Sequence, residues 1–280
     1  MIGRLSGAAT RGFLVALLIA TPALMLPEVK SDSSQFVVLI ALLAGFLTFV
    51  EYNSNFPSII EFRDAPPFNR LRFSAIFLSV FMLAALISHQ TNPTGMTGAV
   101  NSLGVILGNA LDFPYSPVRL AVLMLPPDAS PQMVNTLRMA AGISHFLSIL
   151  GILIFFVCIR FLNWPTRRGA FNVWVNLPLF DPTAGRDVVY RLQRDARINI
   201  TLGFLLPFVI PAWVKLFSIM INPVSLTNPQ TLIWTLSAWA FLPTSMIMRG
   251  LAMAKVASMI TDKRRRAYAD AEADGDFQAA

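Results

Sequence analysis

Histidine and carboxylate side chains supply the residue types that this chain would need for metal binding or acid–base catalysis. His89 lies at the end of one apolar run, and His145 lies within another. If the two runs pack together, these histidines could meet as metal or haem ligands. Glu51, Asp64 and Asp181 could form a carboxylate site that acts on lipid-linked substrates. Interfacial imidazoles bonded to water or backbone, and carboxylates paired with nearby arginines, are the simpler interpretation, and we favour it.

Sequence motifs of hydrolases and nucleotide-binding enzymes do not occur in the chain. It has no G-x-S-x-G, H-E-x-x-H, P-loop or dinucleotide-binding glycine pattern. Its single cysteine, Cys158, lies within an apolar run, which excludes an intramolecular disulfide framework and a cysteine-cluster metal site. We therefore expect a protein that has no metal or cofactor and is not an enzyme. An enzyme acting on lipid-linked substrates stays as an alternative.

The fifth apolar run holds the most specific arrangement of chemistry-bearing residues. Pro207, Pro211 and Lys215 follow one another at four-residue intervals and so lie near one face of a helix. Each proline lacks a backbone N–H, which frees the carbonyls of Gly203 and Pro207. As a candidate transport site, this face would hold an anionic group beside Lys215. A kinked helix whose lysine extends toward water is the simpler interpretation.

The elements that must position these residues are apolar helices. Hydrophobic residues make up 55% and charged residues 13% of the 280 positions, and the mean hydropathy is +0.61. Soluble domains carry about 25% charged residues, so the composition predicts an integral membrane protein. We predict an all-α fold with six transmembrane helices in one domain of residues 1–262, at about 8–26, 36–50, 73–88, 138–162, 198–221 and 231–250.

The first predicted span has two interpretations. It follows Arg4 and Arg11, as the apolar core of a secretory signal peptide also would. No convincing Ala-x-Ala cleavage site follows the run, so we favour a span that stays in the mature protein.

The distribution of lysine and arginine predicts how the spans are oriented. With six spans, eighteen of the 22 basic residues fall on the side that carries both termini, and three fall on the other side. This asymmetry places both termini, the arginine-rich insert 163–197 and the tail 263–280 in the cytoplasm, and segment 89–135 in the periplasm. The short loops and the asymmetry are typical of a multi-pass protein of the bacterial inner membrane.

Basic side chains in the insert and the tail form candidate docking surfaces. They lie beside apolar runs rather than on a soluble basic face, so we expect anionic lipid headgroups or an acidic partner there, and no nucleic acid. The acidic end of the tail, 267–280, has the composition of a disordered segment. The docking residues are Arg167, Arg168, Arg186, Arg191, Arg194, Arg197, Lys263, Arg264, Arg265 and Arg266.

Segment 89–135 is rich in proline, glycine and asparagine, and its most helical part is 99–111. A helix of that length is more often interfacial or re-entrant than spanning. Gly104 and Gly108 have the G-x-x-x-G spacing that lets another helix approach closely, so we assign them a helix-packing role.

Mostly apolar spans with basic surfaces favour a non-enzymatic inner-membrane protein that acts as a subunit, assembly factor or scaffold of a membrane complex. Its expected partners are membrane lipids and either other membrane-protein subunits or further copies of itself. The alternative is a small-solute or lipid transporter that uses the proline-broken fifth span.

Overall fold

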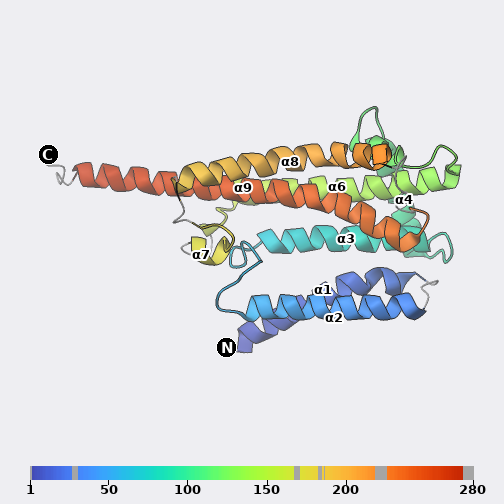
Figure 1. Ribbon diagram of the computed structural model, residues 1–280, viewed down its shortest axis with the longest axis horizontal. Helices are drawn as coiled ribbons and strands as arrows, with labels where there is room; N and C mark the ends of the chain where they lie inside the picture. Colours follow the sequence, from blue (N-terminus) through green and yellow to red (C-terminus); the bar gives the residue numbers. More distant parts are fainter. Residues whose placement is uncertain are drawn as a thin grey trace.

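The protein is almost entirely helical in the computed structural model, which describes residues 2–26, 31–166, 171–181, 185, 187–217 and 226–273. No strand occurs among these residues (Figure 1). The helices are α1 (Ile2–Met25), α2 (Ser31–Asn53), α3 (Phe68–Ser88), α4 (Gly95–Leu111), α5 (Pro117–Val122), α6 (Pro131–Phe161), α7 (Val173–Asn176), α8 (Val188–Phe217) and α9 (Pro229–Ala273).

Six of the described helices, α1, α2, α3, α6, α8 and α9, are long and apolar enough to cross a membrane. This confirms the predicted all-α, multi-pass fold. The six helices lie side by side and reverse direction in turn, so the start of α1 and the end of α9 lie toward the same end of the bundle (Figure 1). We call this the basic end, because the arginines of early α1, of loop 54–67 and of late α9 lie there. Helices α4 and α5 mark the opposite end.

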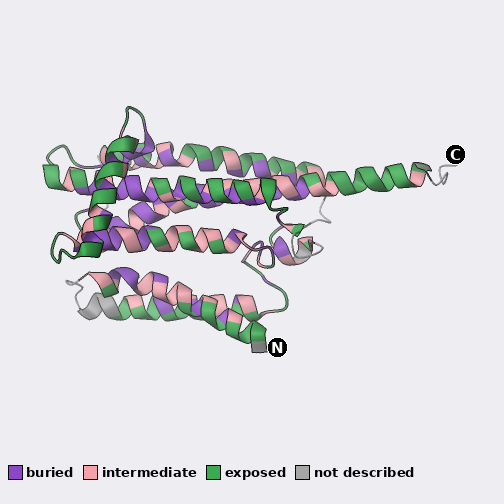
Figure 2. Ribbon diagram, turned by 180° about the vertical axis from the view of Figure 1, so that it is seen from behind, coloured by how far each residue is buried: buried purple, intermediate pink, exposed green. Residues whose placement is uncertain are grey.

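The α1–α2 hairpin forms a layer of its own beside the other spans (Figure 2). Its helices approach closely at two glycines, where a Cβ added to Gly12 would lie 2.6 Å from the Gly45 carbonyl oxygen. Among the described helices, α2 packs on α1 alone. The outer face of α2 exposes large apolar side chains such as Phe36, Leu39 and Phe46, as expected of a helix that faces lipid tails.

The remaining spans pack around α6 and α9. Helix α8 lies along α9, and glycine makes the contact close at two levels. A Cβ added to Gly203 would lie 2.6 Å from the Pro243 carbonyl oxygen, and one added to Gly250 would lie 2.8 Å from that of Ala196. Large, fully buried side chains of α3, α6 and α9 in this core include Leu83, Leu86, Leu137, Ile143, Ile233 and Leu236.

Helix α4 lies across the end of the bundle and turns away from the direction of the spans (Figure 2). It has 17 residues and is not one of the six helices long and apolar enough to cross a membrane. It begins at Gly95, before the predicted 99, because the Thr94 hydroxyl accepts the Thr97 N–H at 3.2 Å and caps the helix. Gly104 and Gly108 are buried against α6, and a Cβ added to Gly142 of α6 would lie only 2.7 Å from the Gly108 Cα.

Loop 54–67 and the insert after α6 fold onto each other at the basic end. The Phe62 N–H donates to the Asn176 carbonyl oxygen at 2.6 Å, and the Trp164 indole donates to the Ala65 carbonyl oxygen at 2.9 Å. Phe62, Phe68 and Trp164 are fully buried together. This part of the insert therefore belongs to the protein core at the basic end.

Helix α9 continues beyond the bundle as a single helix of 45 residues (Figure 1). At about 1.5 Å per residue it is about 68 Å long, roughly twice the hydrocarbon thickness of a bilayer. The expected disorder is wrong for 267–273, because the four alanines and Glu272 of this stretch are strong helix formers that let the helix propagate beyond the basic run 263–266. Residues 274–280 lie outside the described residues, and 261–270 are all exposed.

Candidate functional site

A carboxylate near the end of α2 holds the loop that follows it. Glu51 accepts the backbone N–H groups of Ser58, Ile59 and Ile60 at 2.6, 2.6 and 3.0 Å, and the Ser58 hydroxyl at 3.0 Å. Three of these donors share Oε1, and the Ser58 hydroxyl donates to Oε2. Glu51 therefore anchors loop 54–67 to the end of α2.

Two arginines bind the last carbonyls of α2. Arg63 Nη1 donates to the carbonyl oxygens of Glu51 and Ser54 at 3.0 and 2.8 Å. Arg4, from the start of α1, donates to the Ser54 carbonyl oxygen and, at 2.6 Å, to the Asn55 side-chain oxygen. The C-terminal end of a helix carries partial negative charge, which favours both guanidinium groups at this place.

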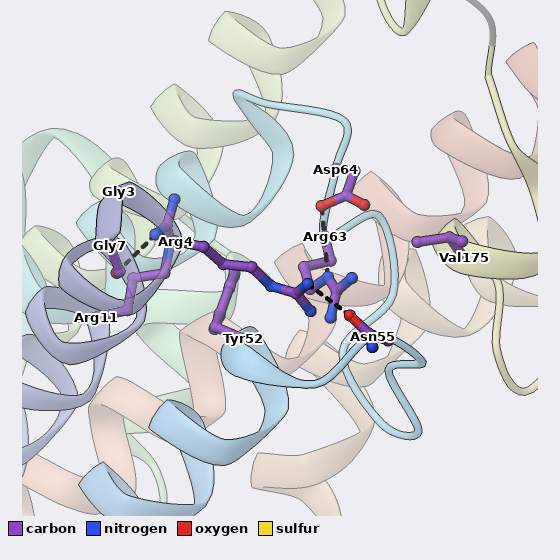
Figure 3. A pocket seen from close by; sticks show the side chains of 9 residues that line it. All are labelled: Gly3, Arg4, Gly7, Arg11, Tyr52, Asn55, Arg63, Asp64 and Val175. Carbon is purple, nitrogen blue, oxygen red and sulfur yellow. Dashed lines mark hydrogen bonds and ion pairs between the residues drawn. The ribbon is translucent and has the colours of Figure 1, made fainter. Parts of the chain in front are cut away.

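Arg11 lies seven residues after Arg4 on α1. Its guanidinium carbon is 4.6 Å from the centre of the Tyr52 ring, and its Nη1 donates to the Gly7 carbonyl oxygen at 2.7 Å. Figure 3 shows Arg4, Arg11, Tyr52 and Arg63 gathered around one space. The guanidinium of Arg11 has five N–H groups, so most of them stay available to a ligand.

The opposite wall comes from loop 54–67, α3 and α9. Arg249 donates to both carboxylate oxygens of Glu61, at 2.6 and 2.8 Å. Arg72 Nη1 lies 3.4 Å from the Asn69 side-chain oxygen, and the buried Nε of Arg72 has no hydrogen-bond partner among the described residues. Arg249 occupies both Glu61 oxygens, and the Arg72 guanidinium lies over the Phe68 and Phe241 rings, 5.3 and 5.8 Å from their centres.

These residues line two adjoining cavities. One is polar and has a volume of about 540 Å³, whereas the other is largely apolar and has a volume of about 1060 Å³. Five arginines and only two carboxylates line the larger cavity. Both cavities are lined by Gly7, Arg11, Tyr52, Arg63 and Asp64. We call the two cavities together the basic pocket.

The lining of the basic pocket changes in order along α1. Arg4 lines the polar cavity alone, Arg11 lines both cavities, and Leu14 and Val15 line the apolar cavity alone. Along α1 the lining thus passes from two cations, Arg4 and Arg11, to an apolar wall at Leu14 and Val15, whereas further arginines line the larger cavity from other elements. An elongated ligand with a polar end, an anion and an apolar part matches this order.

The residues of the predicted transport site have protein partners. Lys215 is exposed, and its Nζ donates to the Leu125 carbonyl oxygen at 3.1 Å. Pro207 and Pro211 are buried, and the Trp239 indole of α9 donates to the Pro207 carbonyl oxygen at 3.2 Å. The carbonyl that Pro211 leaves without its helical donor is therefore bonded to α9.

The two histidines have different neighbours. His89 Nδ1 lies 2.9 Å from the Thr97 hydroxyl oxygen, and the His145 ring stacks on Trp239 with ring centres 5.9 Å apart. In the part of the chain that the structure describes, no three histidine, cysteine, aspartate or glutamate side chains are grouped to hold a metal ion.

The other two acidic residues considered for lipid chemistry have separate contacts within the protein. Asp64 pairs with Arg63 of the basic pocket at 3.4 Å. The backbone carbonyl of Asp181 accepts a hydrogen bond from Arg191 Nη1 at 2.7 Å, in the segment before α8. Glu51, Asp64 and Asp181 do not form a metal-binding group among the described residues.

The predicted docking residues of the insert fall into two groups. Arg191 contacts Asp181 and the Phe180 ring, and Arg194 pairs with Asp195 at 3.0 Å. Arg197 is exposed. Lying outside the described residues are Arg167, Arg168 and Arg186.

The basic run of the tail lies on the projecting part of α9. Arg264 pairs with Asp187, just before α8, at 2.6 Å. The Arg264 guanidinium holds the pKa of Asp187 below its ordinary value. Lys263, Arg265 and Arg266 are exposed, so a docking role for them stays a prediction.

Sequence reasoning treated Arg4, Arg11, Arg72 and Arg249 only as charges that set the orientation. Arg4 and Arg11 did carry a local signal, because a seven-residue spacing with Gly7 between them places the three on one helix face. The meeting of Arg72 and Arg249 at one cavity had no such signal, because it depends on how α3 and α9 pack.

Comparison with known proteins finds no family model that matches the chain, and no curated protein or solved structure that is similar to it. The fold and the basic pocket define a multi-pass helical membrane protein with a cationic, amphipathic cavity at one end of its bundle.

Proposed function

We propose that this chain is a non-enzymatic, multi-pass protein of the bacterial inner membrane that binds an anionic lipid in the basic pocket and serves as a subunit or scaffold of a membrane complex. The observation that carries the lipid proposal is the order of the pocket lining along α1. Arg4 and Arg11 precede Leu14 and Val15 along α1, in the order in which an anionic lipid presents its headgroup and phosphate before its acyl chains.

The dimensions of α1 agree with such a ligand. Arg4 and Leu14 are ten residues apart, which corresponds to about 15 Å along a helix. That length reaches past the headgroup region, which is about 5–8 Å thick on each side of a roughly 30 Å hydrocarbon core, into the start of that core. A phosphate beside Arg11 and Arg63 would leave the acyl chains against Leu14 and Val15.

The charges of the pocket favour a phosphate in particular. Guanidinium groups form paired, charge-assisted hydrogen bonds with phosphate oxygens. The unpartnered Nε of Arg72 supplies a buried donor that an anion would satisfy. The positive-inside rule places the basic end in the cytoplasm, so the lipid would come from the inner leaflet, where anionic headgroups meet basic residues.

Lipid binding to the purified full chain in phosphatidylcholine nanodiscs, measured by native mass spectrometry, tests this function. Phosphatidylglycerol should bind in preference to phosphatidylcholine. Arg11→Gln should lower its affinity about three- to tenfold, because one charge-assisted hydrogen bond is lost. The matched control is Arg160→Gln, which removes an arginine of α6 that does not line the pocket. Equal effects of the two substitutions, or no preference for the anionic lipid, would overturn the proposal.

A role as a complex subunit is favoured by the projecting part of α9. Residues 261–270 form an exposed helix that carries Lys263, Arg265 and Arg266. An acidic partner surface is the expected match for these cations. Replacing the three by glutamine should remove co-purifying subunits in mild detergent while leaving the lipid affinity of the pocket unchanged. Unchanged co-purification would contradict the docking role of this helix.

A further inference from the structure

The polar cavity of the basic pocket extends past the cations that would hold the lipid phosphate. Its volume is about 540 Å³, and Arg4, Asn55 and Asp64 line it together with Val175 of α7 (Figure 3). At about 30 Å³ per water molecule, a cavity of about 540 Å³ has the volume of many water molecules, so it is larger than a bare phosphate needs. The cavity therefore has room for a polar group attached beyond the phosphate.

The lining of that cavity carries both signs of charge. The Asp64 side chain is 57% exposed although it pairs with Arg63 at 3.4 Å, and Asp64 lines the polar cavity. Carboxylate oxygens accept hydrogen bonds from hydroxyl groups, and they repel a second phosphate or carboxylate. A hydroxyl-bearing group suits this place better than a further anion does.

A cationic headgroup suits the cavity less well. An ammonium group beside Asp64 would also lie near the guanidinium groups of Arg4, Arg11 and Arg63, which line the same cavity. Three like charges outweigh one carboxylate, so the local field disfavours an ammonium. The combination of phosphate-binding arginines and one acceptor carboxylate favours a neutral, hydroxylated end.

Resting on the proposed lipid-binding function, we propose that the basic pocket selects an anionic phospholipid whose phosphodiester carries a neutral polyol such as glycerol, and that Asp64 is the specificity-determining residue. The phosphate lies between Arg11 and Arg63, the polyol hydroxyls donate to the Asp64 carboxylate in the polar cavity, and the acyl chains follow α1 into the apolar cavity.

The test compares three lipids with identical acyl chains: phosphatidylglycerol, phosphatidate and phosphatidylethanolamine. Affinities are measured by native mass spectrometry on the full chain, for the native protein and for Asp64→Asn. The native protein should prefer phosphatidylglycerol over each of the other two by about three- to tenfold, the value of one partly exposed hydrogen bond to a charged group. Asp64→Asn should bring the ratio of phosphatidylglycerol to phosphatidate affinity close to one.

A matched control is Asp195→Asn. Asp195 follows Arg194 as Asp64 follows Arg63, and both aspartates pair with the preceding arginine, but Asp195 does not line the pocket. Asp195→Asn should leave all three affinities unchanged. Gel filtration and thermal unfolding show whether Asp64→Asn impairs folding. If it does, the preference of the native protein for phosphatidylglycerol over the other two lipids still tests the headgroup selectivity.

The outcomes separate the two proposals. Asp64→Asn could raise the affinities for phosphatidylglycerol and phosphatidate by the same factor, which would leave their ratio unchanged. In that case Asp64 acts only through its charge, and the selectivity proposal is overturned. The selectivity proposal is also overturned if the native protein binds phosphatidate or phosphatidylethanolamine as tightly as phosphatidylglycerol. If neither phosphatidylglycerol nor phosphatidate is preferred over phosphatidylcholine, and Arg11→Gln changes nothing, the lipid-binding function itself fails.

Discussion

Glu61 and Arg249 lie 188 residues apart in the chain, and the Arg249 guanidinium donates to both Glu61 carboxylate oxygens, at 2.6 and 2.8 Å. This paired contact joins loop 54–67 to the last spanning helix at the wall of the basic pocket. It also takes up both oxygens of the Glu61 carboxylate, while the buried Nε of Arg72 has no hydrogen-bond partner among the described residues.

Breaking the Glu61–Arg249 contact should destabilise the protein. Glu61→Gln removes the charge of a side chain that is only 8% exposed and leaves the Arg249 guanidinium without its partner. The expected loss is about 1–3 kcal/mol of unfolding free energy, measured by chemical or thermal unfolding in detergent.

A double-mutant cycle that combines Glu61→Gln with Arg249→Gln measures the interaction energy of this pair. The double variant should lose less stability than the sum of the single losses, because neither charge is then left unpaired. Arg194→Gln breaks an exposed ion pair at the same end, and its effect should stay within about 0.5 kcal/mol. Strict additivity of the two single losses would contradict the contact.

The crossing of α4 over α6 should not tolerate a side chain at Gly142. An added Cβ would lie 2.7 Å from both the Cα and the backbone nitrogen of Gly108, and backbone cannot move aside as a flexible side chain can. Gly142→Ala should therefore cost about 1–3 kcal/mol of unfolding free energy.

The matched control for Gly142→Ala lies on the same helix. The nearest atom to a Cβ added at Gly151 is the Ala75 Cβ at 3.7 Å, an ordinary contact. Gly151→Ala should be neutral or stabilise the protein by up to about 1 kcal/mol, because alanine favours the helix. Thermal unfolding midpoints that fall equally for both variants would contradict the close crossing.

The indole of Trp239 should matter for stability through its hydrogen bond to Pro207. Trp239→Phe leaves the Pro207 carbonyl without the donor that Pro211 cannot supply. We expect a loss of about 1–2 kcal/mol in unfolding free energy. Trp213→Phe alters an exposed tryptophan of α8 and should change stability by less than about 0.5 kcal/mol. A similar loss for both variants would point to aromatic volume rather than the hydrogen bond.

Lys215→Met distinguishes the lipid-binding proposal from the transport alternative. Its Nζ donates to the Leu125 carbonyl oxygen, so the substitution should cost about 0.5–1.5 kcal/mol of stability. Lys215 does not line the basic pocket, so phosphatidylglycerol affinity should stay unchanged. A fall in lipid affinity as large as that of Arg11→Gln would contradict this, and lost solute flux with normal folding would favour transport.

The Asp187–Arg264 pair should make the attachment of α8 to the projecting part of α9 dependent on pH. The pKa of Asp187 is lowered in the folded protein, chiefly by the hydrogen bond from Arg264. A lowered carboxyl pKa stabilises the fold above the unfolded-state pKa, and this contribution is lost as pH falls through the folded value. The difference in thermal midpoint between the native protein and Asp187→Asn should therefore shrink from about pH 5 downward. A difference that stays constant from pH 7 to pH 3 would contradict it.

The sequence by itself determined the six spans and the all-α class. Hydrocarbon is about 30 Å thick and offers no hydrogen bonds to the backbone, so each crossing must be a long, apolar, helical run that can be recognised locally. Local signals also predicted a short helix at Gly104 and Gly108 with small residues on one side. The same local rules failed for the tail, where helix formers carry α9 on to Ala273.

Only the tertiary structure decided which polar groups meet. Arg11 of α1, Arg63 of the loop, Arg72 of α3 and Arg249 of α9 come from four separate parts of the chain. Their convergence depends on the packing of helices whose apolar faces allow many relative arrangements, so no spacing in the sequence encodes it. The same is true of Lys215, whose partner is the distant Leu125 carbonyl. Bilayer thickness acts on each span alone, whereas a pocket is a property of several spans together.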